Sequence, residues 1–352
     1  MSGESRAGWA ERRWMLAIVG LIAAILVFAA LDLTSTIFAP VACAFFIIAL
    51  AWPMQTALQA RMPQLLALAI VVSVITAVFL VFGSVVAWGF GRIARYLIAD
   101  AARFQAIYEQ ITLWLEGHGV VVAGIWAEHF NVRWLIRAMQ EVTGRVNTTV
   151  TFWLVVLVYV ILGLLEVETI ARKIRSLTSA ATARILIDGS AITAAKFRRY
   201  MVIRTVMSVA TGAFVWALVS MTGLDLAVEW GVIAFALNYI PFIGPFIATV
   251  FPTLFALAQF ASWQTALWVF AGLNVIQFVI GSYIEPRVSG TALAISPFVV
   301  LFSVFFWTYF WGLFGAFIGV PVTIALLTYC AQHPSSQWIA ELFGAPDEER
   351  AA

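Results

Sequence analysis

Eight long apolar runs dominate the sequence, and short polar links separate most of them. A helix needs about 20 mostly apolar residues to cross a bilayer, and only helices and closed barrels satisfy their backbone hydrogen bonds there. Only 11% of the 352 residues are charged, against roughly a quarter in a soluble domain. The sequence therefore predicts an all-α, polytopic transmembrane helical bundle of about eight spans. We place the spans at residues 14–31, 37–57, 65–90, 147–166, 201–222, 228–259, 263–284 and 296–330.

The distribution of basic residues predicts the orientation of these spans. Segment 167–200 is rich in arginine and lysine, so we expect it to be cytoplasmic. The arginine-containing N-terminus and the link with Arg61 agree, whereas the links near Asp32 and Asp225 are acidic and are expected outside. Both termini are then cytoplasmic, if the runs 228–259 and 296–330 each cross the membrane once.

Two connections are long enough to form structure of their own. Residues 92–145 carry apolar and aromatic side chains at spacings of three and four, which predicts amphipathic helices, the second from about Val132 to Thr143. They form either a cap on the bundle or a surface against headgroups or a neighbouring subunit. Segment 167–200 is expected to be an interfacial helical hairpin held by anionic lipid, with a gating role as the alternative.

These features divide the chain into five parts. They are N-terminal transmembrane spans (1–91), an extracytoplasmic amphipathic helical segment (92–145), a fourth span with cytoplasmic interfacial helices (146–200), a C-terminal transport core (201–332) and a cytoplasmic tail (333–352).

The run 228–259 contains a break at membrane depth, Asn238-Tyr-Ile-Pro-Phe-Ile-Gly-Pro245. Each proline lacks a backbone N–H and clashes with the preceding turn, so a regular helix cannot continue through Pro241 and Pro245. Interrupted backbone is tolerated in hydrocarbon only where it packs in protein or lines a wet cavity. The break therefore predicts a pathway for a small polar ligand with several hydroxyls, or for a small cation. The last run has similar breakers up to Pro321, and each of the two runs is either a kinked span or a re-entrant hairpin.

Polar groups at membrane depth concentrate in the C-terminal half of the chain. Asn274 and Gln277 lie three apart on one helix face, where they either line the pathway or bond to another helix. Glu285 and Arg287 form either an interfacial ion pair or, through Glu285, a site that couples transport to protons or cations. The glycines of the last run either allow close helix contact or act as hinges.

Motifs of several other protein classes are absent. The sequence contains no phosphate-binding Gly-x-x-x-x-Gly-Lys-Ser/Thr loop, no His-Glu-x-x-His pair and no nucleophile elbow, so we expect neither enzyme activity nor a cofactor. The three histidines and two cysteines have no metal-site spacing, so we expect no metal site. Basic residues are confined to the links, which argues against nucleic-acid binding.

Four motifs together resemble the signature series of the autoinducer-2 exporter family. They are residues 238–245, Ile284-Glu-Pro-Arg-Val-Ser-Gly290, Ile295-Ser-Pro-Phe-Val-Val300 and Phe310-Trp-Gly-Leu-Phe-Gly-Ala-Phe-Ile-Gly-Val-Pro321. Their order and spacing match, and the resemblance covers essentially the whole chain. The stretch Thr308-Tyr-Phe310 departs from the family pattern because it is bulkier and more aromatic.

The resemblance implies an eight-span transporter of the bacterial inner membrane that forms homo-oligomers, with pentamers expected. It implies secondary active export of a small polar metabolite such as the quorum-sensing signal autoinducer-2, coupled to a proton or cation gradient. The alternative is a sodium (or lithium)/proton antiporter. A membrane scaffold is less favoured, since a scaffold needs no broken helices. The expected partners are the lipid bilayer, a small polar solute, and protons or sodium.

The residues and the resemblance together give two sets of candidate positions. The expected substrate pathway comprises Asn238, Pro241, Gly244, Pro245, Asn274, Gln277, Ser296, Pro297 and Thr308. The expected coupling or gating residues are Glu285, Pro286, Arg287, Gly312, Gly315, Gly319 and Pro321.

Overall fold

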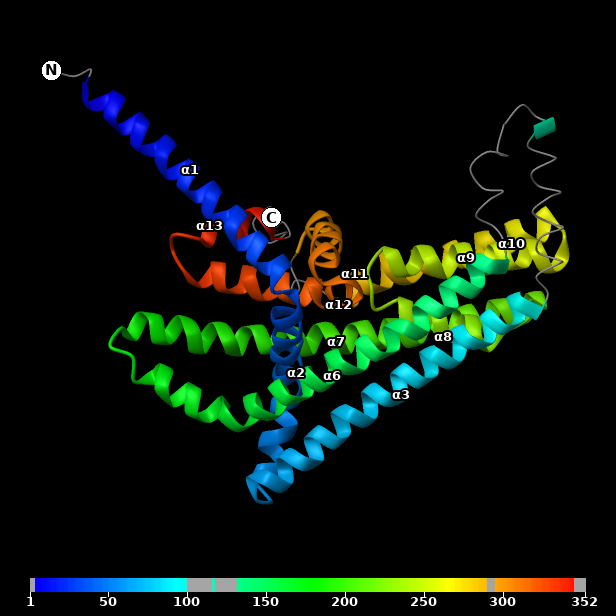
Figure 1. Cartoon of the computed structure of the whole chain (residues 1–352), viewed down its shortest axis with the longest axis horizontal. Helices are drawn as coiled ribbons and strands as arrows, with labels where there is room; N and C mark the ends of the chain where they lie inside the picture. The colour runs from blue at the N-terminus through cyan, green and yellow to red at the C-terminus, as the bar shows by residue number, and fades with distance from the viewer. Residues whose placement is uncertain (1–3, 100–115, 118–131, 290–294, 345–352) are drawn as a thin grey trace.

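The computed structural model describes residues 4–99, 116–117, 132–289 and 295–344, and these are helical almost throughout (Figure 1). Among the described residues, seven helices are long and apolar enough to cross a membrane. This confirms the all-α polytopic membrane bundle. The helices are α1 (Glu4–Leu33), α2 (Ser35–Gln59), α3 (Gln64–Ala99), α6 (Val132–Arg175), α7 (Ala180–Thr222), α8 (Ala227–Leu237), α9 (Ile243–Phe260), α10 (Trp263–Phe278), a π-helical turn (Val279–Ile284), α11 (Glu285–Ser289), α12 (Pro297–Gln332) and α13 (Gln337–Phe343).

Local sequence signals set several helix ends. Ser179 begins α7 by accepting a hydrogen bond from the backbone N–H of Thr182, and Ser262 begins α10 in the same way through Thr265. Gly223 ends α7 in the left-handed conformation, with φ 71°, which glycine adopts without a steric penalty. The apolar runs therefore predict the helices, and capping residues fix where they stop.

The helices α6 and α7 are much longer than a membrane is thick. Their 44 and 43 residues, at about 1.5 Å each, exceed twice the roughly 30 Å of hydrocarbon. The segment 167–200 is therefore the paired ends of two spanning helices, joined at residues 176–179, and not a separate hairpin. The helix expected over 132–143 is likewise the first part of α6, whereas the one expected before it falls largely outside the described residues.

The run 228–259 is a re-entrant hairpin, which we call the first hairpin. It consists of α8, a turn at residues 238–242, and α9, and α8 is too short to span a bilayer alone. Gln259 at the end of α9 accepts a hydrogen bond from the Asp225 backbone N–H (2.8 Å) and donates to the Gly223 carbonyl (3.2 Å). The end of α9 thus returns to the residues that precede α8, and both arms open at the same end of the bundle.

The last run, α12, also folds back on itself, and we call it the second hairpin. Its backbone reverses at Gly312 (φ 57°, ψ −139°), and the arms 297–311 and 313–332 pack against each other. The Trp307 indole donates to the Thr323 hydroxyl (3.2 Å), and a Cβ on Gly319 would lie 3.0 Å from the Ser303 carbonyl oxygen. A straight helix would hold such residues more than 20 Å apart. The condition that each of the two long runs crosses the membrane once is therefore wrong.

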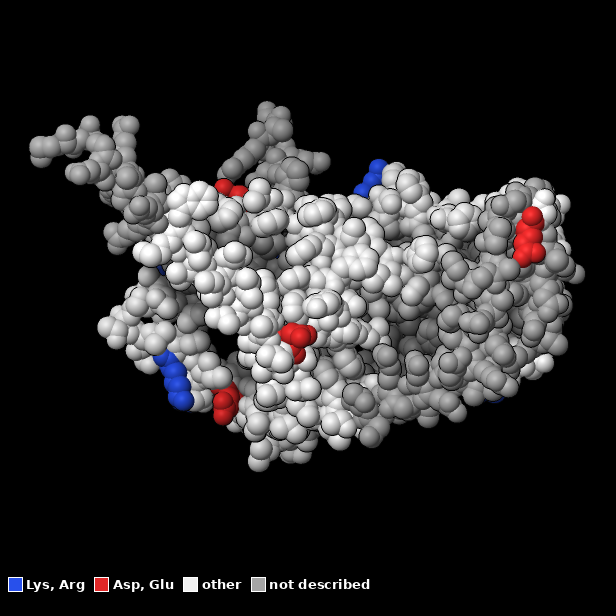
Figure 2. All heavy atoms as spheres, turned by 45° about the horizontal axis from the view of Figure 1, so that its top comes forward, with Lys and Arg blue, Asp and Glu red and all other residues white. Residues whose placement is uncertain are grey.

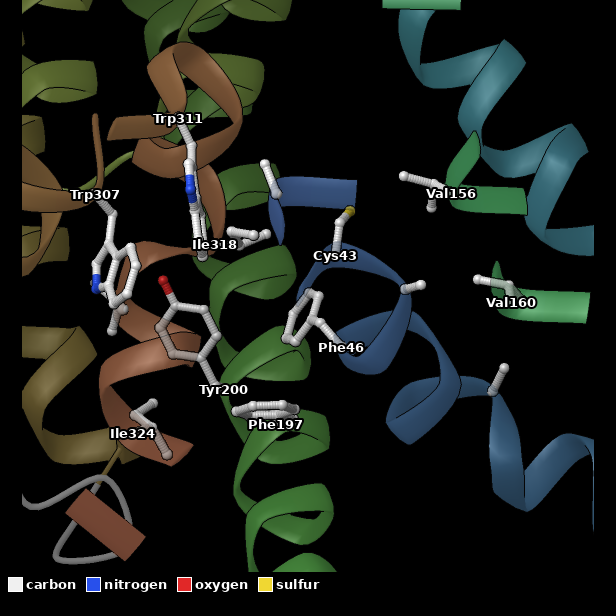
Figure 3. Close-up of a cluster of buried hydrophobic side chains, with 14 of the residues drawn as sticks. Cys43, Phe46, Val156, Val160, Phe197, Tyr200, Trp307, Trp311, Ile318 and Ile324 are labelled. Carbon is white, nitrogen blue, oxygen red and sulfur yellow. The ribbon is translucent and has the colours of Figure 1, made fainter. Parts of the chain in front are cut away.

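The main apolar core joins α2, α6, α7 and α12 (Figure 3). Phe46 of α2 meets Phe197 of α7 edge-to-face at 5.0 Å, and Trp307 lies 4.4 Å from Trp311 within the second hairpin. The described part of the surface in Figure 2 is mostly uncharged. Many large apolar side chains are exposed on it, as expected for a surface that faces lipid.

Candidate transport site

Both hairpins pack against helix α7. The first hairpin lies along the C-terminal half of α7, and the two approach closely there: a Cβ added to Gly212 would lie 2.8 Å from the Gly231 carbonyl oxygen. The second hairpin packs at the N-terminal half of α7, where Ser190 and Tyr329 share a hydrogen bond of 2.8 Å. The two hairpins therefore open at opposite ends of α7.

The hairpins meet near the middle of the bundle. The ring of Tyr239, in the turn of the first hairpin, lies 5.6 Å from the ring of Phe317 in the second. Ile240 is buried in the same apolar cluster as Trp307 and Ala316. The non-helical turn of the first hairpin thus packs in the interior on the second arm of the second hairpin.

Asn238 lies at this meeting point and is almost completely buried. Its side-chain amide donates to the Ser208 hydroxyl of α7 (3.2 Å), and the Tyr239 hydroxyl donates to the Thr205 hydroxyl (3.1 Å). Asn238 is 5% exposed and Ser208 is not exposed at all. The turn therefore presents polar groups to α7 at a depth where a polar group without a partner is costly.

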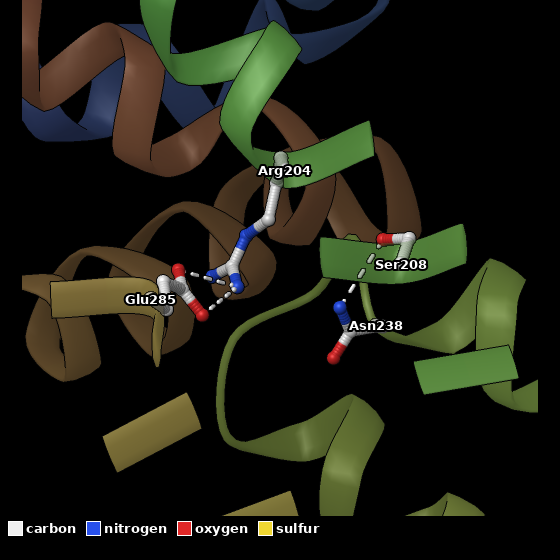
Figure 4. Close-up of polar contacts among 4 residues, drawn as sticks. All are labelled: Arg204, Ser208, Asn238 and Glu285. Atoms are coloured by element: carbon white, nitrogen blue, oxygen red, sulfur yellow. Dashed lines mark hydrogen bonds and ion pairs between the residues drawn. The ribbon is translucent and has the colours of Figure 1, made fainter. Parts of the chain in front are cut away.

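One turn of α7 away from Ser208, an ion pair joins α7 to the start of α11 (Figure 4). The Arg204 guanidinium lies 2.9 Å and 3.0 Å from the two carboxylate oxygens of Glu285. Arg204 is 7% exposed, so desolvation opposes its charge and the carboxylate offsets this cost. α10 and α11 therefore bring Glu285 to the level of Arg204, one turn of α7 from the Asn238–Ser208 pair.

The open end of the first hairpin is clamped to α3. Arg92 lies 3.0 Å from Glu229 of α8, and the Tyr96 hydroxyl donates to Asp225 (2.8 Å). The two α3 residues are one turn apart, and their acidic partners lie just before α8 and in its first turn. These contacts hold the base of the first hairpin against α3.

The structure brings only some of the predicted pathway residues together. Asn238, Pro241 and Gly244 are buried in the turn, beside the half-buried Pro245. Asn274, in contrast, is exposed and donates to the Phe270 carbonyl of its own helix (2.8 Å).

Three further predicted positions lie in or before the second hairpin. Ser296 and Pro297 begin its first arm, with the Ser296 backbone N–H donating to the Phe343 carbonyl (3.4 Å), and Thr308 bonds back to the Val304 carbonyl. Both of these hydrogen bonds therefore stay outside the first hairpin.

Among the predicted coupling residues, the expected ion pair of Glu285 with Arg287 is wrong. Arg287 lies over the ring of Tyr283 at 3.7 Å, because residues two apart on a helix point to nearly opposite sides, and Glu285 pairs with Arg204 instead. Pro286 is exposed beside them. Of the remaining predicted positions in this set, Gly312 is exposed where the second hairpin reverses. The others are buried in the same hairpin: Gly315, Gly319 and Pro321.

The polar face of α7 was not predicted from the sequence. Arg204, Ser208 and Thr211 follow one another at spacings of four and three, so they share one face of an otherwise apolar helix. That spacing was available as a signal, but Ser208 and Thr211 are small, and Arg204 falls at the start of the span predicted at 201–222, where an arginine is expected to reach water. Among the described residues, no group of three or more His, Cys, Asp or Glu side chains could hold a metal ion.

Comparison with known proteins identifies the family. The family model described as "AI-2E family transporter" matches residues 16–333, which is nearly the whole chain. The chain belongs to the AI-2E transporter family. This AI-2E family member is therefore a multi-pass membrane transporter, and its relatives point away from an enzyme.

Curated relatives agree with this assignment of the AI-2E family member. It is 25% identical over 327 residues to AI-2 transport protein TqsA of Escherichia coli (strain K12), covering 92% of this chain and 94% of that protein. A putative transport protein of Haemophilus influenzae (strain Rd) is 25% identical over 93% of this chain and 95% of its own. Putative transport protein YhhT of Escherichia coli (strain K12) is 33% identical over 35% of each chain.

Proposed function

We propose that this AI-2E family member is a secondary active exporter of a small polar metabolite such as autoinducer-2, driven by a proton or cation gradient. The observation that carries the proposal is the contact of two oppositely opening hairpins beside the buried Asn238–Ser208 pair. A rigid channel does not need two interrupted helices that close on each other. Movement of either turn would expose the polar groups to water at one end of the bundle only, which is what alternating access requires.

The orientation belongs to the same proposal. The chain lies in a bacterial inner membrane, with the basic ends of α6 and α7 and both termini on the cytoplasmic side. The first hairpin then opens outward and the second inward. Homo-oligomers, with pentamers expected, are the proposed assembly, as the family resemblance implies.

A sodium/proton antiporter is the competing function. Glu285 is the acidic residue that we consider for coupling, because it lies near the hairpin turns. Its charge is already neutralised by Arg204. This pairing favours solute transport over antiport, because an antiporter needs a carboxylate that alternates between a proton and a cation.

Counterflow with purified protein in liposomes tests the proposal. Liposomes loaded with unlabelled autoinducer-2 should accumulate labelled autoinducer-2, and those loaded with sodium should not accumulate labelled sodium. Sodium counterflow without autoinducer-2 counterflow would select the antiporter. Protein-free liposomes control for leakage.

A further inference from the structure

Among the described residues, five buried side-chain atoms on α7 and α10 have no hydrogen-bond partner. Thr193 Oγ1 and Tyr200 Oη lie toward the N-terminal end of α7, and the other three are Thr211 Oγ1, Arg204 Nε and, on α10, Gln277 Nε2. In folded proteins roughly nine in ten buried polar groups are paired, and an unpaired one costs about 1–3 kcal/mol. Three such atoms in one region indicate that a partner belongs between them.

Thr211 departs from the usual behaviour of hydroxyls in these helices. Thr76, Thr249, Ser303 and Thr328 each donate to the carbonyl four residues earlier, at 2.6–2.9 Å. This local bond satisfies a hydroxyl that has no other role. Thr211 is completely buried and does not make it. Its oxygen is therefore available to another group.

The three atoms lie in one region of the interface between α7 and α10. These helices run antiparallel, since Gly272 of α10 packs on Leu218 while Glu285 pairs with Arg204. Interpolation between these two contacts places Gln277 within one helical turn of the level of Thr211. Arg204 lies two turns from Thr211 on the same α7 face.

That face points between the first hairpin and α10. On one side of it, Ser208 and Gly212 contact the first hairpin. On the other side, Ile203 and Met207 pack on Ile280 of the π-helical turn. At 100° per residue, Arg204 and Thr211 fall between these two sides. In Figure 4, the Arg204 guanidinium accordingly lies between Glu285 and the Asn238–Ser208 pair.

We propose that Thr211, Gln277 and the Arg204 Nε–H bind the transported solute, and that this solute is electrically neutral and carries several hydroxyl or carbonyl oxygens. The inference rests on the proposed transport function. An amide N–H, a guanidinium N–H and a hydroxyl supply mainly donors, which select acceptor oxygens. The single cation of the site is already neutralised by Glu285, so an ionic solute would add a buried charge without a counter-ion.

Counterflow in liposomes with three labelled solutes tests the site and the solute class. D-ribose is neutral with adjacent hydroxyls, D-ribonate has the same carbons with a carboxylate, and sodium is a bare cation. The wild type should carry D-ribose and neither ion. Thr211→Val and Gln277→Leu should each raise the half-saturation concentration of D-ribose about five- to tenfold, the loss of roughly one hydrogen bond.

Matched variants separate binding from folding. Thr211→Ser keeps the hydroxyl and should behave as the wild type. Thr76→Val removes an equivalent hydroxyl on α3 and should also leave the half-saturation concentration unchanged. Size-exclusion profiles identify any variant that fails to fold, and Gln277→Glu, which retains the side-chain size but removes the donor, then replaces Gln277→Leu.

Each outcome decides a different point. If D-ribose is carried equally well by the wild type, Thr211→Val and both Gln277 variants, this site is wrong while the transport function stands. Preference for D-ribonate or sodium would contradict the neutral class. If the wild type carries neither D-ribose nor autoinducer-2, the proposed function and this inference fail together.

Discussion

At the scale of single residues, Gly315 is where the second hairpin tolerates least change. A Cβ at this position would lie 1.8 Å from the Trp307 carbonyl oxygen, and that atom belongs to backbone that cannot move aside easily. Gly315→Ala should therefore lower the yield of folded protein and cost more than about 2 kcal/mol of stability, as overpacking does. Thermal unfolding of the purified variant measures this loss.

Gly83 on α3 is the matched control, because no atom lies within 4 Å of a Cβ added there. Gly83→Ala should unfold at the wild-type temperature or slightly above it. Equal stability of the two variants would mean that the arms of the second hairpin do not approach as described.

The Arg204–Glu285 pair gives a second prediction at residue scale. Either Arg204→Gln or Glu285→Gln alone leaves a largely buried charge without its partner and should destabilise the protein by about 2–3 kcal/mol. The double variant should lose less than the sum of the two single losses, since it leaves no charge behind. Chemical denaturation of all four proteins measures the coupling, and additive losses would show that the two groups do not interact.

At the scale of elements, the contact between the hairpin turns can be tested by cross-linking. With Cys43 and Cys330 replaced by alanine, Tyr239→Cys and Phe317→Cys should be joined by a short bis-methanethiosulfonate cross-linker, because the two rings are in contact but their Cβ atoms stand too far back for a direct disulfide. The cross-link should stop transport, and a reductant should restore it. Each single cysteine variant is the control for damage by the substitution itself. Efficient cross-linking without loss of transport would mean that the turns do not need to separate.

The limits of prediction from sequence are also clearest at this scale. Apolar length predicts the spanning helices, and Pro241 and Pro245 predict the interruption, because both effects are local. Neither effect distinguishes a kinked span from a hairpin. That choice depends on contacts between distant residues, such as Gln259 with Gly223, which no local pattern reports. Thr211 escaped notice for a related reason: a threonine in a helix is ordinary until its missing hydrogen bond is known.

At the scale of the whole molecule, the account depends on the number of true crossings. With two re-entrant hairpins, we propose six spanning elements among the described residues: α1, α2, α3, α6, α7 and the α10–α11 helix. Five of them are long and apolar enough to cross a membrane, and α1 has a shorter apolar stretch, Ile18–Leu33. An even number of crossings keeps both termini on one side, as eight spans would. The termini therefore cannot test the account, whereas the two ends of the first hairpin can.

Sided labelling of single cysteines is the most direct test of this arrangement. Val228→Cys, Ser262→Cys and Thr178→Cys place a thiol at the start of the first hairpin, just after its end, and in the link between α6 and α7. A membrane-impermeant maleimide applied to cells with a permeabilised outer membrane should label positions 228 and 262, and should label position 178 only after the inner membrane is opened. Labelling of 228 and 262 from opposite sides would contradict the re-entrant hairpin and the transport site built on it.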